Sequence, residues 1–159
     1  MTAAGQEAPV QKIPLDVFQV VDLPITITDT ALVKTRNSYL LTCSLTNNSE
    51  FPLIGLRYAL AVVDSTNAAN TVMIKDEGLK LAQSQTKIIT FRTPIKLKIK
   101  AGEQLVLMLQ EVVSTDYTWE VIKAKEALGA YIAGDYSVVP RVVRVSNMVD
   151  APRGTKVIY

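Results

Sequence analysis

The sequence contains no histidine, and this absence limits its possible chemistry more than any residue that is present. Histidine is the commonest general base and the commonest metal ligand in proteins. Ser-His-Asp catalysis, Cys-His catalysis and ordinary zinc sites are therefore excluded. We predict a protein that is not an enzyme and that carries no cofactor and no metal.

Paired carboxylates are the remaining route to hydrolysis, because glycosidases work without histidine. The pairs to consider are Glu111 with Asp116 and Asp76 with Glu77. Adjacent residues point to opposite sides of a strand, so Asp76 and Glu77 make poor partners. Neither pair has supporting residues at a recognisable spacing. A histidine-free glycosidase is therefore the weakest of our function hypotheses.

The single cysteine, Cys43, permits no internal disulfide. It alternates with Leu41 and Leu45 on one side of an expected strand. Nothing nearby in the sequence would lower the pKa of its thiol. We predict a small buried apolar side chain rather than a reactive one.

The stretch between Gly78 and Gly102 contains cations and no carboxylate. One interpretation is a strip that binds a polyanionic glycan, a phosphate-bearing polymer or an acidic partner. The other, which we favour, is a solvated strand whose lysines prevent pairing with other chains. The candidate anion-binding residues are Lys87, Arg92, Lys96, Lys98 and Lys100.

Tyr117 and Trp119, close to Asp116, suggest an aromatic site. Exposed together, the two rings would form a platform on which a sugar can stack. The alternative, which we favour, is a core tryptophan between two sheets, as β-sandwiches commonly have.

The composition is that of one globular domain. The chain has 159 residues, 48% of them hydrophobic and 20% charged, and a net charge of +2. This charge is too small to indicate nucleic-acid binding. The longest apolar run, residues 58–63, is far shorter than the roughly 20 residues of a membrane-spanning helix.

The elements that must position these residues are mostly strands. Two alternating runs, 38–46 and 53–64, flank an Asn/Ser/Pro corner, and we predict that they pair at the centre of an antiparallel sheet. The second run is expected to have one shared face, formed by Leu56, Tyr58, Leu60 and Val62. Apolar residues at helical spacing predict a short helix at about 124–134, which either plugs an open end of the sandwich, as we favour, or docks a partner. Further strands are expected at 15–23, 25–34, 71–76, 85–92, 95–100, 104–114, 118–122 and 137–147.

This pattern predicts an all-β fold, an antiparallel immunoglobulin-like β-sandwich with one short helix near the C-terminus. A closed barrel is the alternative, and unequal strand lengths and Pro-marked edges favour the sandwich. We expect a flexible N-terminal arm over residues 1–14, a single domain over 15–149 and a C-terminal tail over 150–159.

The N-terminal residues look like sequence that follows a cleaved signal peptide, being small and polar. We therefore expect an exported protein, periplasmic or extracellular. A cytoplasmic protein with a mobile N-terminus would have the same appearance, so that alternative stays open.

Several segments carry a resemblance to known modules. They are the Asn-Asn-Ser corner at 47–49, the strand ending in Val-Val-Asp at 62–64 and the Ala-Gly-Glu turn at 101–103 before QLVLML. Together they resemble the immunoglobulin-like and fibronectin-type-III-like modules of exported bacterial proteins, in particular the FxLYD-type group. Residues 111–119 are similar to a V-x-F-x-D-G-x-x-W strand of such proteins, although Tyr117 stands where glycine is expected.

The resemblance covers roughly residues 25–122 and implies a fold without active residues, since most such modules are regarded as non-enzymatic. Our leading hypothesis is thus a non-catalytic module for protein–protein or cell-surface contact. Its partner would be a protein or a surface glycan, with no nucleic acid and no membrane span. The alternative is a carbohydrate-binding module that uses Tyr117 and Trp119.

Overall fold

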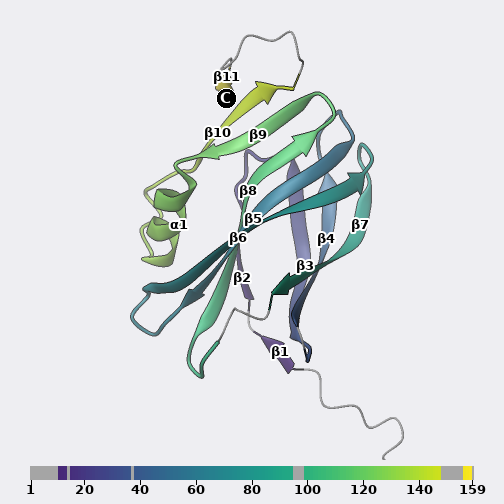
Figure 1. The fold of residues 1–159 in the computed structure, drawn as a ribbon. Helices are drawn as coiled ribbons and strands as arrows, with labels where there is room; N and C mark the ends of the chain where they lie inside the picture. Colours follow the sequence, from purple (N-terminus) through teal and green to yellow (C-terminus); the bar gives the residue numbers. More distant parts are fainter. Residues whose placement is uncertain (1–10, 14, 37, 95–98, 148–155, 159) are drawn as a thin grey trace, which may run out of the picture.

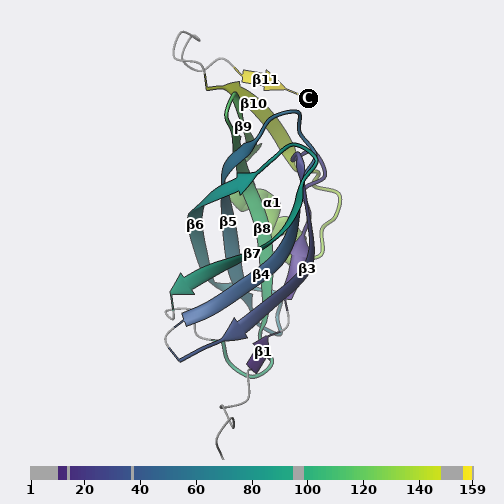
Figure 2. The ribbon, with the colours of Figure 1, turned by 90° about the vertical axis from the view of Figure 1, so that its right-hand side faces the viewer.

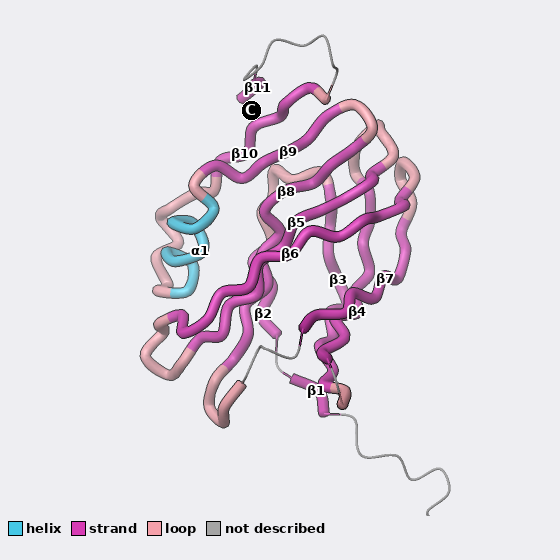
Figure 3. The backbone as a smooth tube through the Cα atoms, in the orientation of Figure 1, coloured by secondary structure: helices cyan, strands magenta, loops and turns pink. Residues whose placement is uncertain are grey.

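Two β-sheets packed against each other form the body of the protein (Figure 1). The computed structural model describes residues 11–13, 15–36, 38–94, 99–147 and 156–158. Its one helix among these residues lies beside the larger sheet (Figure 3). The predicted all-β sandwich is thus confirmed.

The two sheets differ in width. The smaller sheet has the strand order β1 (Gln11–Ile13), β3 (Ile25–Lys34), β4 (Ser38–Asn47), β7 (Thr86–Pro94). The larger sheet has the order β11 (Lys156–Ile158), β10 (Arg141–Ser146), β9 (Tyr117–Ile122), β8 (Gln104–Ser114), β5 (Leu53–Val63), β6 (Ala69–Leu81). Neighbouring strands in both orders run antiparallel, whereas β2 (Leu15–Phe18) lies parallel to β8. The helix α1 (Ala124–Ile132) connects β9 to β10.

The predicted pairing of the two central runs is wrong. Strand β4 pairs with β3 and β7 in the smaller sheet, whereas β5 pairs with β6 and β8 in the larger one. The Asn/Ser/Pro corner between them therefore carries the chain from one sheet to the other. Two alternating strands around a turn have the same sequence pattern whether they pair or cross, so periodicity alone does not distinguish the two arrangements.

The fully buried side chain of Asn47 stabilises the corner in which the chain passes from the smaller to the larger sheet. Its Nδ2 donates hydrogen bonds to the carbonyl oxygens of Phe51 (2.8 Å) and Leu81 (3.0 Å). Its Oδ1 accepts bonds from the backbone nitrogen and the hydroxyl of Ser49, both at 2.8 Å. These bonds join the β4–β5 corner to the end of β6. They also engage the amide on which a glycosylation sequon at residues 47–49 would depend.

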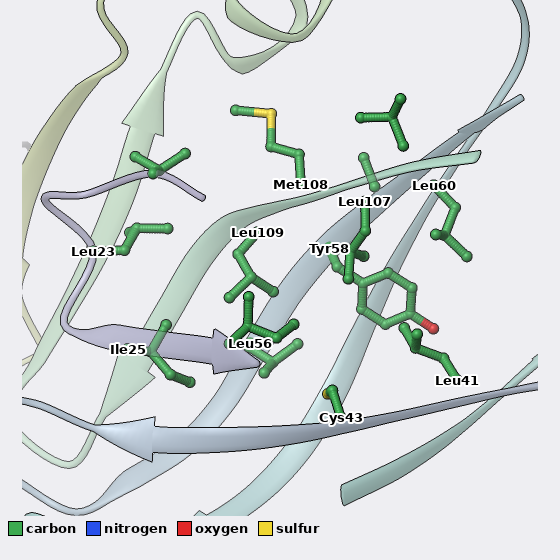
Figure 4. Packing of buried hydrophobic residues seen from close by; sticks show 14 of the residues in the cluster. Leu23, Ile25, Leu41, Cys43, Leu56, Tyr58, Leu60, Leu107, Met108 and Leu109 are labelled. Atoms are coloured by element: carbon green, nitrogen blue, oxygen red, sulfur yellow. The ribbon is translucent and has the colours of Figure 1, made fainter. Parts of the chain in front are cut away.

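The core lies between the inner faces of the two sheets (Figure 4). Leu56, Tyr58 and Leu60 point from β5 toward Leu41 and Cys43 of β4. All five side chains are at most 2% exposed. The predicted inward faces of both runs are therefore confirmed.

Burial also determines the state of the cysteine. The Cys43 side chain is fully buried, and burial raises the pKa of its thiol to about 11. Because the thiolate is the reactive form, this thiol is chemically inert in the folded protein. The prediction of a packing role is confirmed.

Several element boundaries differ from the predicted ones. Residues 11–13, within the predicted flexible arm, form β1 on the edge of the smaller sheet, and residues 156–158, within the predicted tail, form β11. Strand β6 is much longer than the predicted 71–76, although it does lie at an edge. These strands depend on partners distant in the sequence, which local pattern does not reveal. Of the strand predicted at 95–100, residues 95–98 lie outside the described part, and 99–100 are not strand.

We expect Asn47→Ala to destabilise the fold strongly, because it leaves buried carbonyl and amide groups without partners. The loss should be about 3 kcal/mol in the free energy of unfolding, measured by urea denaturation. The matched control is Asn48→Ala in the same corner. Asn48 is exposed and donates one side-chain bond, to Thr26 Oγ1 (2.7 Å), so its loss should cost less than about 0.5 kcal/mol. Equal effects of the two substitutions would contradict the role assigned to Asn47.

Candidate functional site

The larger sheet extends past the smaller one (Figures 1 and 2). Its strands β10 and β11 lie beyond the edge of the smaller sheet. The chain before β3 and the β4–β5 corner cover part of this overhanging region. They are held together by the Asn48 backbone nitrogen, which donates to the Pro24 carbonyl oxygen (2.9 Å). A concavity of about 400 Å³ remains between them and the larger sheet. We call it the aromatic cleft; it is lined by Asp22, Pro24, Asn48, Ser49, Glu50, Phe51, Trp119 and Arg144.

Strand register brings the key residues of the aromatic cleft together. Trp119 of β9 lies directly opposite Arg144 of β10. The Arg144 guanidinium lies 4.0 Å from the centre of the Tyr117 ring, a cation–π contact. The Tyr117 ring lies 5.3 Å from Phe51 and 6.3 Å from Trp119, centre to centre. Three aromatic rings and one cation thus gather at one place.

The structure brings Tyr117 and Trp119 together but does not form the open platform. Trp119 is only 7% exposed, because β8 and β10 flank its strand and the overhanging face is covered. The alternative of a core tryptophan, which we favoured, agrees with this burial. Trp119 contributes to the lining of the aromatic cleft instead of presenting a free ring face.

The aromatic cleft suits a ligand that has both an apolar face and polar groups. Asp22 and Glu50 are exposed carboxylates that accept hydrogen bonds, and Arg144 is a donor. Ligand sites typically combine aromatic walls with a few convergent polar groups in this way. Sequence reasoning missed Phe51, Arg144 and Asp22, because they come from segments far apart in the chain and carry no local motif.

The predicted lysine strip does not form one surface among the described residues. Lys87 and Arg92 are an odd number of positions apart on β7, so their side chains leave opposite faces of that strand. Lys100 lies in the turn before β8. Lys96 and Lys98 lie outside the described residues.

The lysines at this edge contact backbone carbonyls instead. Lys87 Nζ donates to the carbonyl oxygen of Lys80 (3.1 Å), and Lys75 Nζ donates to that of Arg92. These bonds join the edge strands β6 and β7 of the two sheets. They support the interpretation that lysines protect the edges from pairing with other chains.

Three of the carboxylates considered for hydrolysis are paired with cations. Arg57 binds Asp76 at 2.7 Å and Glu111 at 3.4 Å, and Glu77 pairs with Lys75 at 2.8 Å. Burial raises the pKa of Glu111, and Arg57 opposes this rise. The hydrogen bond from Arg57 lowers the pKa of Asp76.

The two carboxylates of each pair make separate contacts in this arrangement. Asp116 lies in the turn between β8 and β9, where its carboxylate accepts a bond from the Thr115 hydroxyl (2.8 Å). Asp76 and Glu77 point to opposite faces of β6, as the alternation predicted. Among the residues described, no group of three or more acidic or cysteine side chains could hold a metal ion.

The helix α1 does not plug an end of the sandwich; it packs on the outer face of the larger sheet. Tyr131 stacks on Phe18 of β2, with ring centres 4.2 Å apart and planes at 9°, and its hydroxyl donates to Asp16 Oδ2 (2.9 Å). Burial and this carboxylate raise the pKa of Tyr131 to about 12. Asp16 and Phe18 lie beside Val106 and Met108 of β8, and Figure 4 shows Met108 pointing away from the core side chains Leu107 and Leu109. In the described part of the chain, no helix is long and apolar enough to span a bilayer.

Comparison with known proteins gives no relative: neither a family model, nor a curated protein, nor a solved structure matches this chain significantly.

We expect the fluorescence of Trp119, the only tryptophan, to be blue-shifted and resistant to quenching by iodide and acrylamide. The physical reason is that 93% of the side chain is withdrawn from solvent in the fold, since only 7% is exposed. Unfolding in urea should shift the emission to the red and restore quenching, which provides the control. Efficient quenching in the native protein would contradict the burial of Trp119 and would favour the hypothesis of an exposed aromatic platform.

Proposed function

We propose that this chain is a non-catalytic β-sandwich module that works by contact with another protein or with a cell surface. The observation that carries the proposal is the aromatic cleft. There the chain before β3, the β4–β5 corner and strands β9 and β10 bring Trp119, Phe51 and Arg144 to one concave surface.

The composition of the aromatic cleft supports macromolecular contact. Trp, Tyr and Arg are the residues that contribute most binding energy at protein interfaces, and they cluster in concave, desolvated places. Arg144 is held over Tyr117, so little side-chain freedom remains to be lost on binding. The exposed carboxylates of Asp22 and Glu50 border the same surface and favour a partner that brings a cation or hydrogen-bond donors.

The proposed setting is the periplasm or the cell exterior. It is supported by the resemblance to modules of exported bacterial proteins. Localisation of the full coding sequence, fused to a reporter, is the direct measurement.

Site-specific photo-crosslinking tests the contact function. A photoreactive phenylalanine analogue replaces Glu50 at the rim of the aromatic cleft, and the protein is irradiated in extracts of the cells from which it derives. The matched control carries the analogue at Thr28, which is exposed on the smaller sheet. We expect one discrete adduct from position 50 that is absent from position 28. When Arg144→Gln is added to the protein that carries the analogue at position 50, the yield of the adduct should fall at least threefold, because the central cation of the aromatic cleft is lost.

Two results would count against this proposal. One is the same adduct from both positions, since contact would then not be centred on the aromatic cleft. The other is an adduct whose yield does not respond to Arg144→Gln in a protein that remains folded by circular dichroism.

Carbohydrate binding is the second candidate for the same surface. It is favoured by the presence of Asp22, Asn48 and Glu50, which can bond sugar hydroxyls, next to the rings of Phe51 and Trp119. We expect a glycan array to show selective binding that falls at least tenfold in Glu50→Ala, with Thr28→Ala as the matched control. A silent array together with a protein adduct at position 50 would decide for protein contact.

A further inference from the structure

A second concavity opens between α1 and the edge strand β6, away from the aromatic cleft. We call it the helix groove; its cavity volume is about 440 Å³. This volume lies within the roughly 300–1,000 Å³ that is usual for small-molecule sites. It is lined by Ala69, Val72, Ile74, Gln110, Lys125, Leu128, Gly129 and Ile132.

The helix groove leaves apolar surface open to solvent. Val72 is 48% exposed and Ile74 is 58% exposed, on the face of β6 that looks toward the helix. The helix groove is open because α1 is attached on one side. Tyr131 fixes that side to β2, and the opposite side of the helix lies apart from β6. An apolar lining is typical of small-molecule sites.

Gly129 enlarges the helix groove. A Cβ atom at this position would have no neighbour within 4 Å, and the backbone is helical. The helix therefore does not require glycine here for steric reasons. A Cβ atom at this position would extend into open space beside the lining of the helix groove.

Charge along the helix groove is polarised. Lys125, its one cationic lining residue, lies in the first turn of α1, whereas Leu128 and Ile132 follow toward the helix end. The positive end of the helix dipole lies at the same end as Lys125. Glu126, also in the first turn, lies outside the lining. One end of the helix groove thus carries a cation, and the rest of its lining is apolar except for Gln110.

We propose that the helix groove binds a small amphiphile with a single anionic head and an unbranched apolar chain, as in a medium-chain fatty acid. The head lies against Lys125, and the chain runs between Leu128 and Ile132 of α1 and Val72 and Ile74 of β6. Charge complementarity at one end and apolar lining along the rest select this ligand class. The site is separate from the aromatic cleft, so this inference does not depend on the contact function.

Titration with sodium decanoate below its micelle concentration, followed by ¹H–¹⁵N NMR, tests the proposal. We expect saturable shifts at the amides of Val72, Ile74, Leu128 and Gly129. The neutral analogue 1-decanol, which keeps the apolar chain but lacks the charge, should bind at the same amides about three- to fivefold more weakly, as expected for loss of one exposed ion pair.

Three variants separate the apolar and the charged contributions. Gly129→Leu fills the helix groove and should abolish binding of decanoate, whereas the matched control Gly129→Ala should stay within threefold of the wild type. Both replacements favour helix, so neither should unfold α1. Lys125→Gln should weaken decanoate about three- to fivefold and leave 1-decanol unchanged.

Several outcomes would overturn the proposal. They are the absence of saturable shifts, shifts that map outside the helix groove, and decanoate binding that survives in a folded Gly129→Leu protein. Equal affinity for decanoate and 1-decanol would overturn the anionic head, and general loss of native resonances would show detergent-like unfolding instead of binding.

Discussion

The buried amide of Asn47 is the interaction on which the arrangement of the two sheets depends. Its side chain binds the corner that leads from β4 to β5 and the carbonyl of Leu81 at the end of β6. Its backbone pairs with Gln85 and Ser84, in the connection from β6 to β7. One residue thus joins two places at which the chain changes sheets. The same bonds fix the corner that supplies Phe51 and Glu50 to the aromatic cleft.

Both concavities lie where one layer of the structure does not fully cover the next. Because the larger sheet extends past the smaller one, part of its inner face is covered by loops, and the aromatic cleft lies in that region. Its outer face would expose Met108 and its neighbours to water if α1 did not cover them. The helix is narrower than the face that it covers, and the helix groove remains beside it. Both concavities are therefore found at places where the layers differ in extent, whereas the fully covered centre forms the core.

Much of the fold could be predicted from local pattern. Alternation correctly assigned β3, β4 and β5 and the inward faces that include Cys43 and Tyr58, since a half-buried strand repeats every second residue. A run that is apolar on both faces assigned β8. Helical spacing located α1. The candidate site was predicted only in part: Tyr117 and Trp119 were named, but Phe51 and Arg144 were not. Their approach to Tyr117 depends on strand register and on the β4–β5 corner, which no short stretch of sequence specifies.

The sequence by itself determined the class of the fold, the identity of the inward faces and the absence of histidine chemistry, because these depend on residue type and on a period of two. Only the tertiary structure decided that β4 and β5 belong to different sheets and that α1 covers a sheet face. The physical reason is that partner choice is made by contacts between residues distant in the chain. Local sequence pattern shows that one face of a strand or helix must be buried, but it does not show which other element covers that face.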